Sequence, residues 1–346
     1  MSGAREILDP TRMSDGAGAL AGGMEQRIVG QDQAIQQIVN MYQTFLAGMA
    51  TPGRPVGSLL FLGPTGSGKT RTVEALAETL TGSPRSVVKI DCAEFQHSHE
   101  IAKLIGSPPG YLGHRETHPA LSQDALNQFH TETLKLSFVL FDEIEKASDA
   151  LWNLLLGILD KATLTLGDNR RVDFSRAIIF MTSNLGASEM NAILRPKLGF
   201  STGIADAKLT DKLSHAGSEA ARRRFSPEFL NRIDGVVSFK PLGEAELHRI
   251  LDIELRAVQE RIFRATGSDS VTLALNLGAR EFLLREGTDS RYGARHLKRA
   301  IEKHLVQPLS NLIASGQLRS GESVTVETDS NRLTFVKEPG EFFAAA

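Results

Sequence analysis

The sequence has little of what a secreted, membrane-spanning or zinc-stabilised protein needs. Cys92 is its one cysteine, so no internal disulfide can form, and no Cys-x-x-Cys pair is present for a zinc ribbon. No apolar run approaches the roughly 20 residues of a membrane span. Residues 1–20 also lack the apolar core of a secretory signal. These absences predict a cytoplasmic protein without a membrane partner.

An excess of charge of one sign is missing as well. Lys and Arg number 39 against 41 Asp and Glu, which gives a net charge of -2. A broadly cationic nucleic-acid binder would show a basic excess, so we expect no nucleic-acid partner. The 346 residues are 41% hydrophobic and 23% charged, as in ordinary globular proteins. At roughly 100–200 residues per domain, this length predicts two structural units or one large one.

Apolar runs alternate with helical patterns through the first two thirds of the chain. The strand candidates are residues 58–63, 86–91, 136–142 and 176–184. Helical patterns such as 71–80 and 150–159 separate them. Continuous apolar strands alternating with helices indicate a parallel sheet with helices on both faces. The predicted fold class is therefore α/β.

The chain divides into four predicted segments. Residues 1–23 are rich in Gly, Ala, Ser and Asp and predict a flexible arm. A large nucleotide-binding domain follows over 24–238. A smaller, mainly helical lid domain over 239–338 ends in two alternating segments that predict a β-hairpin. Residues 339–346 read as a flexible tail, either a cloning remnant or a degron-like tag.

A phosphate-binding loop follows the first strand candidate. Residues 63–70 match G-x-x-x-x-G-K-[ST] between a strand and a helix. Its backbone N–H groups can surround phosphates, and the helix N-terminus favours their charge. We expect Lys69 to reach the β and γ phosphates of ATP and the Thr70 hydroxyl to ligate Mg²⁺. The predicted cofactor-binding loop consists of Gly63, Pro64, Thr65, Gly66, Ser67, Gly68, Lys69 and Thr70.

Polar residues also end two later strand candidates. The strand 136–142 ends in Asp142 and is followed by Glu143. Asp142 is placed to hold the Mg²⁺ shell, and Glu143 to orient or deprotonate the attacking water. Asn184 follows the strand 176–184 and is either a residue that positions this water or a simple turn residue.

These motifs, in this order, resemble the AAA+ ATPases of the Clp family, most closely the second ATPase module of ClpB, ClpA and ClpC. The resemblance covers nearly everything from about residue 25 to 338. It rests on residues 27–35, 55–70, 105–113, 140–147, 181–187, 225–234 and 292–299. The sequence departs from the family in showing no first ATPase module, middle domain or adaptor-binding domain. Its segment 114–123 also departs from the acidic, Gly-rich stretch usual there.

The resemblance implies roles for further residues. Ile28 and Val29 would line the adenine pocket, and Asn184 would be the first sensor. Arg232, in Phe-Leu-Asn-Arg-Ile-Asp, matches the arginine finger that completes the neighbouring subunit's site. The family therefore implies a ring, which we expect to be a homo-hexamer. Arg295, in Gly-Ala-Arg, matches the second sensor. Surface ion pairs are the alternative for both arginines.

Two loops would contact proteins. Residues 106–113 resemble the axial pore loop of Clp unfoldases, in which Tyr111 with Leu112 would grip an unfolded or tagged polypeptide. Leu198, Gly199 and Phe200 match the tripeptide with which ClpA, ClpC and ClpX dock into the ClpP peptidase and which ClpB lacks. The alternatives are an inward-packed tyrosine and a loop hydrophobe that caps the core.

Three other signals have simpler explanations. His97 and His99 could suggest a metal site, but residues two apart do not share a helix face. Trp152 falls in an apolar helical pattern that predicts a core face. The basic run 222–224 is typical of a solvated helix face.

We therefore expect an ATP-driven protein unfoldase that threads polypeptides through a ring and delivers them to ClpP. The alternative within the family is a stand-alone remodelling chaperone or disaggregase. A nucleic-acid translocase or transcription activator of the AAA+ superfamily is disfavoured by the balanced charge and the aromatic pore loop. An ATP-dependent assembly switch that binds partners without threading is the fourth hypothesis.

Overall fold

A computed structural model describes residues 8–107, 118–194, 206–266, 271–288, 293–329 and 332–338. The chain divides into two compact units. The first comprises residues 1–63 and 69–239, and the second comprises residues 240–346 with the segment 64–68. Each unit has its own hydrophobic core, so each is described by itself.

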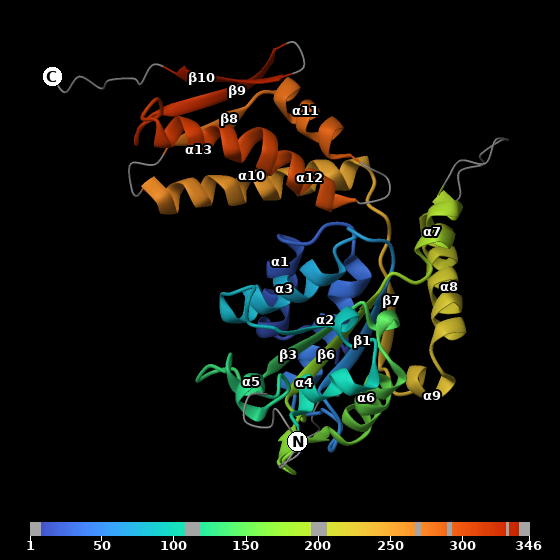
Figure 1. The fold of residues 1–346 in the computed structure, drawn as a ribbon. Coiled ribbons are helices and arrows are strands. Elements are labelled where there is room, and N and C mark those ends of the chain that lie inside the picture. Colours follow the sequence, from blue (N-terminus) through green and yellow to red (C-terminus); the bar gives the residue numbers. More distant parts are fainter. Residues whose placement is uncertain are drawn as a thin grey trace, which may run out of the picture. The chain divides into compact units, whose positions relative to one another are not determined.

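A five-stranded sheet forms the centre of the first unit (Figure 1). Its order is β2-β3-β6-β1-β7, and all neighbouring strands are parallel. The strands are β1 (Gly57–Leu62), β2 (Val88–Asp91), β3 (Ser137–Asp142), β6 (Ala177–Ser183) and β7 (Gly235–Ser238). The predicted α/β fold class is confirmed. The four predicted strands are present, whereas the edge strand β7 was not predicted.

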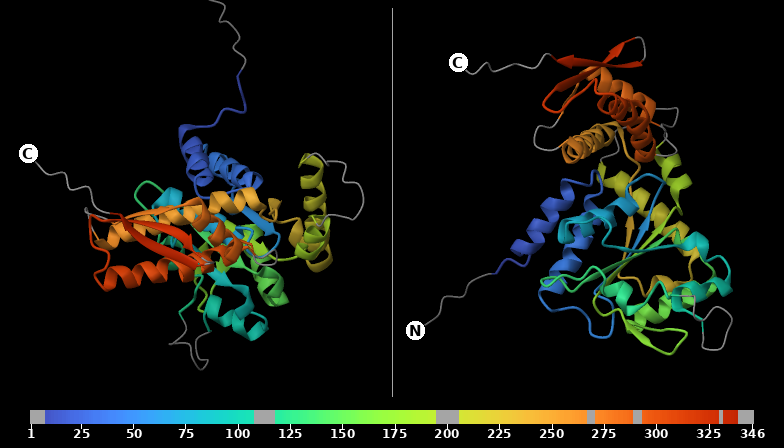
Figure 2. Two further views of the ribbon diagram at one scale, coloured as in Figure 1. Left: turned by 90° about the horizontal axis from the view of Figure 1, so that it is seen from above. Right: turned by 60° about the vertical axis from the view of Figure 1, so that its left-hand side comes forward.

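Side chains of the central strands alternate between two hydrophobic cores, one on each face of the sheet. Phe61 and Phe180 belong to the core formed with α1 (Asp15–Glu25), α2 (Asp32–Leu46) and α3 (Lys69–Thr81). Leu60 and Met181 belong to the other. That second core includes residues of α6 (Asp149–Lys161), α8 (Asp206–Arg224) and α9 (Pro227–Leu230). Figure 2 shows the ribbon of these elements from two further directions. The sheet is therefore covered on both faces, as the apolar runs predict.

The prediction of a flexible arm over residues 1–23 is wrong for its second half. Helix α1 begins at Asp15, after Ser14, whose side chain accepts a hydrogen bond from the Ala17 N–H. Ala17, Leu20 and Met24 are buried at helical spacing. One of the glycines that suggested flexibility permits close packing instead, since a Cβ at Gly23 would lie 2.4 Å from a Thr79 methyl carbon.

Short elements complete the first unit on the side of α6. They are α4 (Ala102–Ile105), α5 (Gln123–Asn127), α7 (Ala187–Leu194) and the antiparallel pair β4 (Thr163–Thr165) and β5 (Arg171–Asp173). The β4–β5 pair was not predicted, because three-residue strands carry almost no periodicity.

The second unit is mainly helical, with a small sheet. Its helices are α10 (Glu244–Thr266), α11 (Leu277–Gly287), α12 (Ala294–Ile301), a π-helical turn (Glu302–Val306) and α13 (Gln307–Ala314). The expected terminal hairpin is present as β9 (Ser323–Asp329) and β10 (Arg332–Glu338). The unpredicted β8 (Thr272–Leu275) pairs with β9 in parallel, so the sheet has the order β10-β9-β8.

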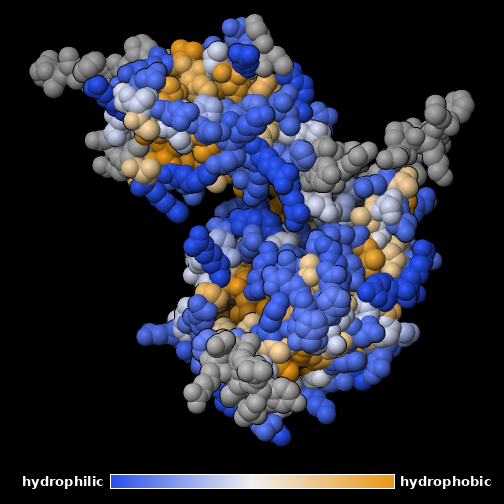
Figure 3. Space-filling model, in the orientation of Figure 1, coloured by the Kyte–Doolittle hydropathy of each residue, from blue (hydrophilic) through white to orange (hydrophobic). Residues whose placement is uncertain are grey.

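The surface is mainly hydrophilic on the face that Figure 3 shows, with hydrophobic residues between the polar ones. Within the described ranges, no helix combines the length and the apolar character that a bilayer crossing requires.

Candidate functional site

The order of the strands determines where the predicted site residues meet. β6 lies between β3 and β1, and the three strands run parallel. The segments that follow these strands therefore leave the same edge of the sheet side by side. Such an edge is where open α/β sheets bind ligands. It brings together Lys69 and Thr70, the acidic pair at 142–143 and Asn184.

The loop after β1 depends on glycine geometry. Gly63 has a φ of 144°, and a Cβ at this position would lie 2.6 Å from the carbonyl oxygen of Phe239. Lys69, at the start of α3, is buried, with 8% of its surface exposed. Its Nζ donates to the Gly63 carbonyl at 2.6 Å and to Asn184 Oδ1 at 3.0 Å. The ammonium is thus held over the loop, where it can meet a phosphate.

Thr70 and Asp142 face each other across the strand ends. The Thr70 hydroxyl lies 3.3 Å and 3.4 Å from the two carboxylate oxygens of Asp142. Asp142 also accepts a hydrogen bond from Thr182 on β6 and pairs with Lys89 Nζ at 3.3 Å. A hydroxyl and a carboxylate are the hard oxygen donors that Mg²⁺ prefers. These two side chains therefore fit a magnesium site, with Lys89 supplying a positive charge on the outer side.

Glu143 has a strained backbone. Its φ of 58° and ψ of 48° lie in the left-handed region, which costs a non-glycine residue about 1–3 kcal/mol. Its N–H donates to Thr182 Oγ1 at 3.0 Å. Its carboxylate accepts from Asn184 Nδ2 at 3.2 Å and from Lys146 Nζ at 2.5 Å. The hydrogen bond to Glu143 raises the pKa of Lys146 above its usual value. Both carboxylate oxygens are thus oriented by partners.

Cys92 lies under this acidic group, just after β2, and is fully buried. Burial raises the pKa of its thiol far above the usual value, and the negative charges of Asp142 and Asp91 add to the effect. A thiol in this environment stays protonated and is a poor nucleophile. Cys92 therefore belongs to the packing beneath the site.

The remaining predicted site residues belong to other segments of the chain. Arg232 is half-buried and pairs through Nε with Asp160 Oδ1 of α6 at 2.7 Å, without the alignment of a hydrogen bond. Ile28 and Val29 are both buried in the turn between α1 and α2. Arg295 is exposed in the first turn of α12, in the second unit. Tyr111, Leu112, Leu198, Gly199 and Phe200 lie outside the described residues.

Sequence reasoning missed several side chains that position the site. Thr182 joins Asp142 to the Glu143 backbone, and Lys89 pairs with Asp142. Glu145 Oε1 accepts a hydrogen bond from the Asn184 N–H at 3.0 Å. The available signal is positional. Thr182 lies one residue and Lys89 two residues before the end of a strand that borders β3.

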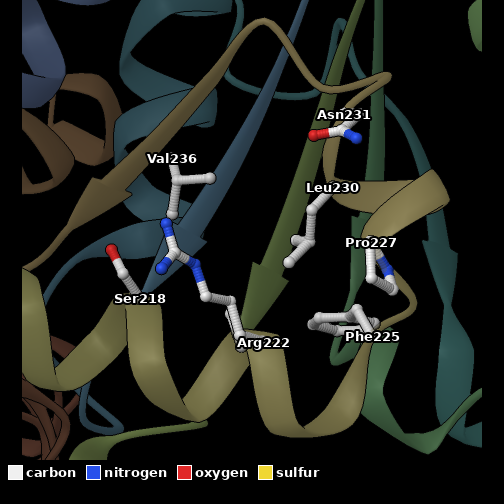
Figure 4. Close-up of a pocket in the computed structure, with 8 residues that line it drawn as sticks. Ser218, Arg222, Phe225, Pro227, Leu230, Asn231 and Val236 are labelled. Carbon is white, nitrogen blue, oxygen red and sulfur yellow. The ribbon is translucent and has the colours of Figure 1, made fainter.

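The basic run 222–224 at the end of α8 is exposed, as predicted, and its three arginines also make contacts. Arg222 lines a groove between α8, α9 and β7, where its guanidinium lies between Ser218 and Val236 (Figure 4). Arg223 pairs with Glu219 on the surface at 3.6 Å. Arg224 instead lies over the ring of Trp152, 4.4 Å from its centroid.

His97 and His99 form no metal site with other ligands in the part of the chain that the structure describes. Their rings stack on each other at 5.7 Å. The Glu100 carboxylate accepts a hydrogen bond from the His97 N–H and closes the short turn that follows.

Comparison with known protein families assigns both units. A family model described as the AAA domain (Cdc48 subfamily) matches residues 54–236, more than half of the chain. The chain belongs to this AAA family. A second model, described as the C-terminal, D2-small domain of ClpB protein, matches residues 242–326. These matches confirm the predicted resemblance to the second ATPase module of Clp proteins, and with it an AAA+ ATPase domain that carries a nucleotide site.

Curated relatives of this AAA protein include chaperone protein ClpB of Bdellovibrio bacteriovorus, 39% identical over 315 residues. ClpB of Meiothermus ruber is 38% identical over 319 residues. These matches cover 90% and 91% of this chain but 34% of each relative, so the chain spans about a third of their length. A closed-state cryo-EM structure of Hsp104 with ATPγS and FITC casein is similar, with a TM-score of 0.76 and 30% identity. That match covers 94% of this chain and 53% of the Hsp104 chain.

Proposed function

We propose that this chain is the ATP-hydrolysing motor of a protein-remodelling chaperone that acts without a protease partner. The observation that carries the proposal is the convergence of Lys69, Thr70, Asp142, Glu143 and Asn184 at one edge of the sheet. The match of 90% of this chain to part of ClpB supports a chaperone as the function. ATP and Mg²⁺ are the implied cofactors.

The residues divide the chemical work. Lys69 binds the β and γ phosphates, where its buried charge is poorly screened by water. Thr70 and Asp142 hold Mg²⁺, which when bound neutralises phosphate charge. Glu143 accepts a proton from the attacking water, and Asn184, already bonded to Lys69 and Glu143, aligns that water. Ile28 and Val29 provide the apolar contact for adenine.

Arg232 and Arg295 serve the assembly in this proposal. Arg232 enters the neighbouring subunit's site, where a guanidinium stabilises charge on the transferring phosphoryl group. Because it would act in trans, the active form is a ring, which we propose to be a homo-hexamer. In this proposal, Asp160 pairs with Arg232 when no neighbour's phosphate is bound, and the phosphate then replaces Asp160. Arg295 senses the nucleotide from the second unit.

Mixing subunits tests the ring. Arg232→Ala subunits added to wild type should lower ATP hydrolysis by more than their fraction, because each variant inactivates a neighbour's site. A loss proportional to the fraction added would contradict action in trans. Lys161→Ala changes an exposed residue next to Asp160 and is the matched control. Mixing these subunits with wild type should lower ATP hydrolysis no further than any loss at their own sites explains.

The handling of substrate distinguishes the function from its rival. We propose that Tyr111 and Leu112 grip an unfolded polypeptide and that ATP hydrolysis moves it through the ring. The relatives described above favour this stand-alone chaperone over the delivery of substrates to ClpP, because they are ClpB proteins, the subfamily without the docking tripeptide. In this proposal, the tripeptide of Leu198, Gly199 and Phe200 does not dock ClpP.

The test is recovery of a chemically aggregated fluorescent protein, followed with ATP, with Tyr111→Ala, and with purified ClpP. We expect ATP-dependent recovery that Tyr111→Ala abolishes and that ClpP does not convert into degradation. Degradation that requires ClpP and residues 198–200 would establish the rival instead. Recovery undiminished by Tyr111→Ala would favour a partner-binding switch that does not thread.

A further inference from the structure

The last residue of α8 joins two parts of the first unit that the proposed mechanism uses separately. Arg224 Nη2 donates to the backbone carbonyl of Glu145 at 2.9 Å. The same guanidinium lies 4.4 Å from the centroid of the Trp152 ring, in the first turn of α6. One side chain therefore contacts both the turn that follows Glu143 and the helix beside it.

Trp152 completes this contact. Its indole Nε1 donates to the carbonyl of Ile144 at 3.0 Å, and its ring packs edge-on against Phe225 at 5.4 Å. Two successive carbonyls of the turn are thus held by side chains, one from the following helix α6 and one from the end of α8. Because Glu145 Oε1 accepts from the Asn184 N–H, the same turn also fixes the start of the segment after β6.

The segment that begins at Arg224 carries Arg232. Ser226 caps α9 by accepting from the Phe229 N–H at 3.2 Å, and the Arg232 N–H donates to the Phe229 carbonyl at 3.2 Å. Arg232 then pairs with Asp160 near the other end of α6. A short, hydrogen-bonded path therefore runs from the turn after Glu143 to Arg232.

We propose that Arg224 and Trp152, called here the Arg224 clamp, are positioning residues that tie the turn after Glu143 to the segment bearing Arg232. The inference rests on the proposed function, in which Glu143 serves the nucleotide of its own subunit and Arg232 that of the neighbour. Movement of Arg232 toward a neighbour's phosphate is then transmitted to Glu143. The clamp sets turnover and its cooperativity between subunits, and it leaves nucleotide affinity unchanged.

The experiment measures ATP hydrolysis against ATP concentration, giving kcat, KM and a Hill coefficient, together with binding of a fluorescent ATP analogue. The variants are Arg224→Ala and Trp152→Phe, which keeps a ring for Arg224 but loses the Nε1 donor. Arg223→Ala is the matched control, because Arg223 pairs with the surface carboxylates of Glu219 and Glu189 and not with the turn after Glu143, as far as the described residues extend. Size-exclusion chromatography confirms assembly of each variant.

We expect Arg224→Ala to lower kcat about fivefold, as the loss of one hydrogen bond and one exposed cation–π contact implies. Its Hill coefficient should fall toward 1, while KM and analogue binding stay within about twofold. Trp152→Phe should lower kcat by about half as much on a logarithmic scale. Arg223→Ala should have the wild-type kcat and Hill coefficient. If Arg224→Ala does not assemble, Trp152→Phe decides the question by the same criteria.

Wild-type kcat and Hill coefficient in an assembled clamp variant would overturn the inference, as would a raised KM with unchanged kcat. Failure of the proposed function gives a different result. In that case the wild-type chain itself binds the analogue without hydrolysing ATP, or does neither.

Discussion

Two loops at the same edge of the central sheet build the candidate site in different ways. The loop after β1 turns on glycines, with Gly63, Gly66 and Gly68 at positive φ, and Lys69 bonds back to Gly63. The loop after β3 places Glu143, a non-glycine residue, in the left-handed region. Its geometry depends on partners far away in the sequence.

The difference separates binding from turnover. The glycine loop can be recognised from its own residues, because glycines that adopt positive φ and a following helix N-terminus are features that bind phosphate. The acidic loop is correct only when Thr182, Asn184 and Arg224 are all in place. A loop that depends on other elements can also respond to them. This property suits ATP hydrolysis, the step whose timing has to be coordinated between the subunits of a ring.

Lys69→Ala gives the largest expected effect on the first loop. It removes a buried charge that would meet the phosphates, and hydrogen bonds to charged groups are worth about 1.5–3 kcal/mol, or about 10–150-fold in affinity. Isothermal titration with an ATP analogue should show this loss. Wild-type affinity in Lys69→Ala would contradict the assignment of the loop. Lys103→Ala, outside the loop, is the control.

Gly63→Ala should damage the local geometry of the same loop. The new Cβ would lie 2.6 Å from the Phe239 carbonyl oxygen at a φ of 144°. We expect the free energy of unfolding to fall by about 2–4 kcal/mol, the sum of backbone strain and a clash with backbone. Gly82→Ala separates these causes, since Gly82 has a φ of 77° but no described atom within 4 Å of its Cβ. It should lose only about 1–2 kcal/mol in the same thermal or urea unfolding.

Thr182→Val should damage the second loop selectively. The substitution keeps the shape of a buried side chain but removes the hydroxyl that joins Asp142 to the Glu143 N–H. We expect kcat to fall about tenfold with a small change in analogue binding, because a buried donor and acceptor lose their partner. Thr165→Val, on the exposed face of β4, should leave kcat unchanged. Equal loss of binding and turnover would show that the two loops do not divide the work.

Lys89→Ala should have the smallest effect. Lys89 is half-exposed and lies 3.3 Å from Asp142, so the pair adds little stability. Its positive charge opposes a cation at the same carboxylate. The Mg²⁺ concentration for half-maximal hydrolysis should therefore fall about twofold to threefold, an effect that 0.5 M salt weakens. A higher Mg²⁺ requirement in this variant would mean that Lys89 orients Asp142 for the metal.

The same difference explains what the sequence predicts and what it does not. Residues 63–70, Asp142 and Asn184 could be found in advance, because each follows an apolar strand and strand order brings them together. The positive φ of Glu143 and the contact of Arg224 with Trp152 could not, since both depend on tertiary packing between segments far apart in the chain.

The fold shows the same limit. Four strands of the central sheet were predicted, whereas β7 and β8 were not. Helix α1 was taken for a flexible arm because small residues hid its apolar stripe of Ala17, Leu20 and Met24. In each case the missing information is the surface against which the segment packs.

The most direct test of the account is Glu143→Gln, measured for analogue binding and for phosphate release in the same preparation. The amide keeps the shape and the contact with Asn184 but cannot accept the proton of water. We expect analogue affinity within about twofold of wild type and hydrolysis lower by about 10²–10⁴-fold, the range for loss of a general base. Hydrolysis at the wild-type rate would contradict the assignment of Glu143 and with it the division of work between the two loops.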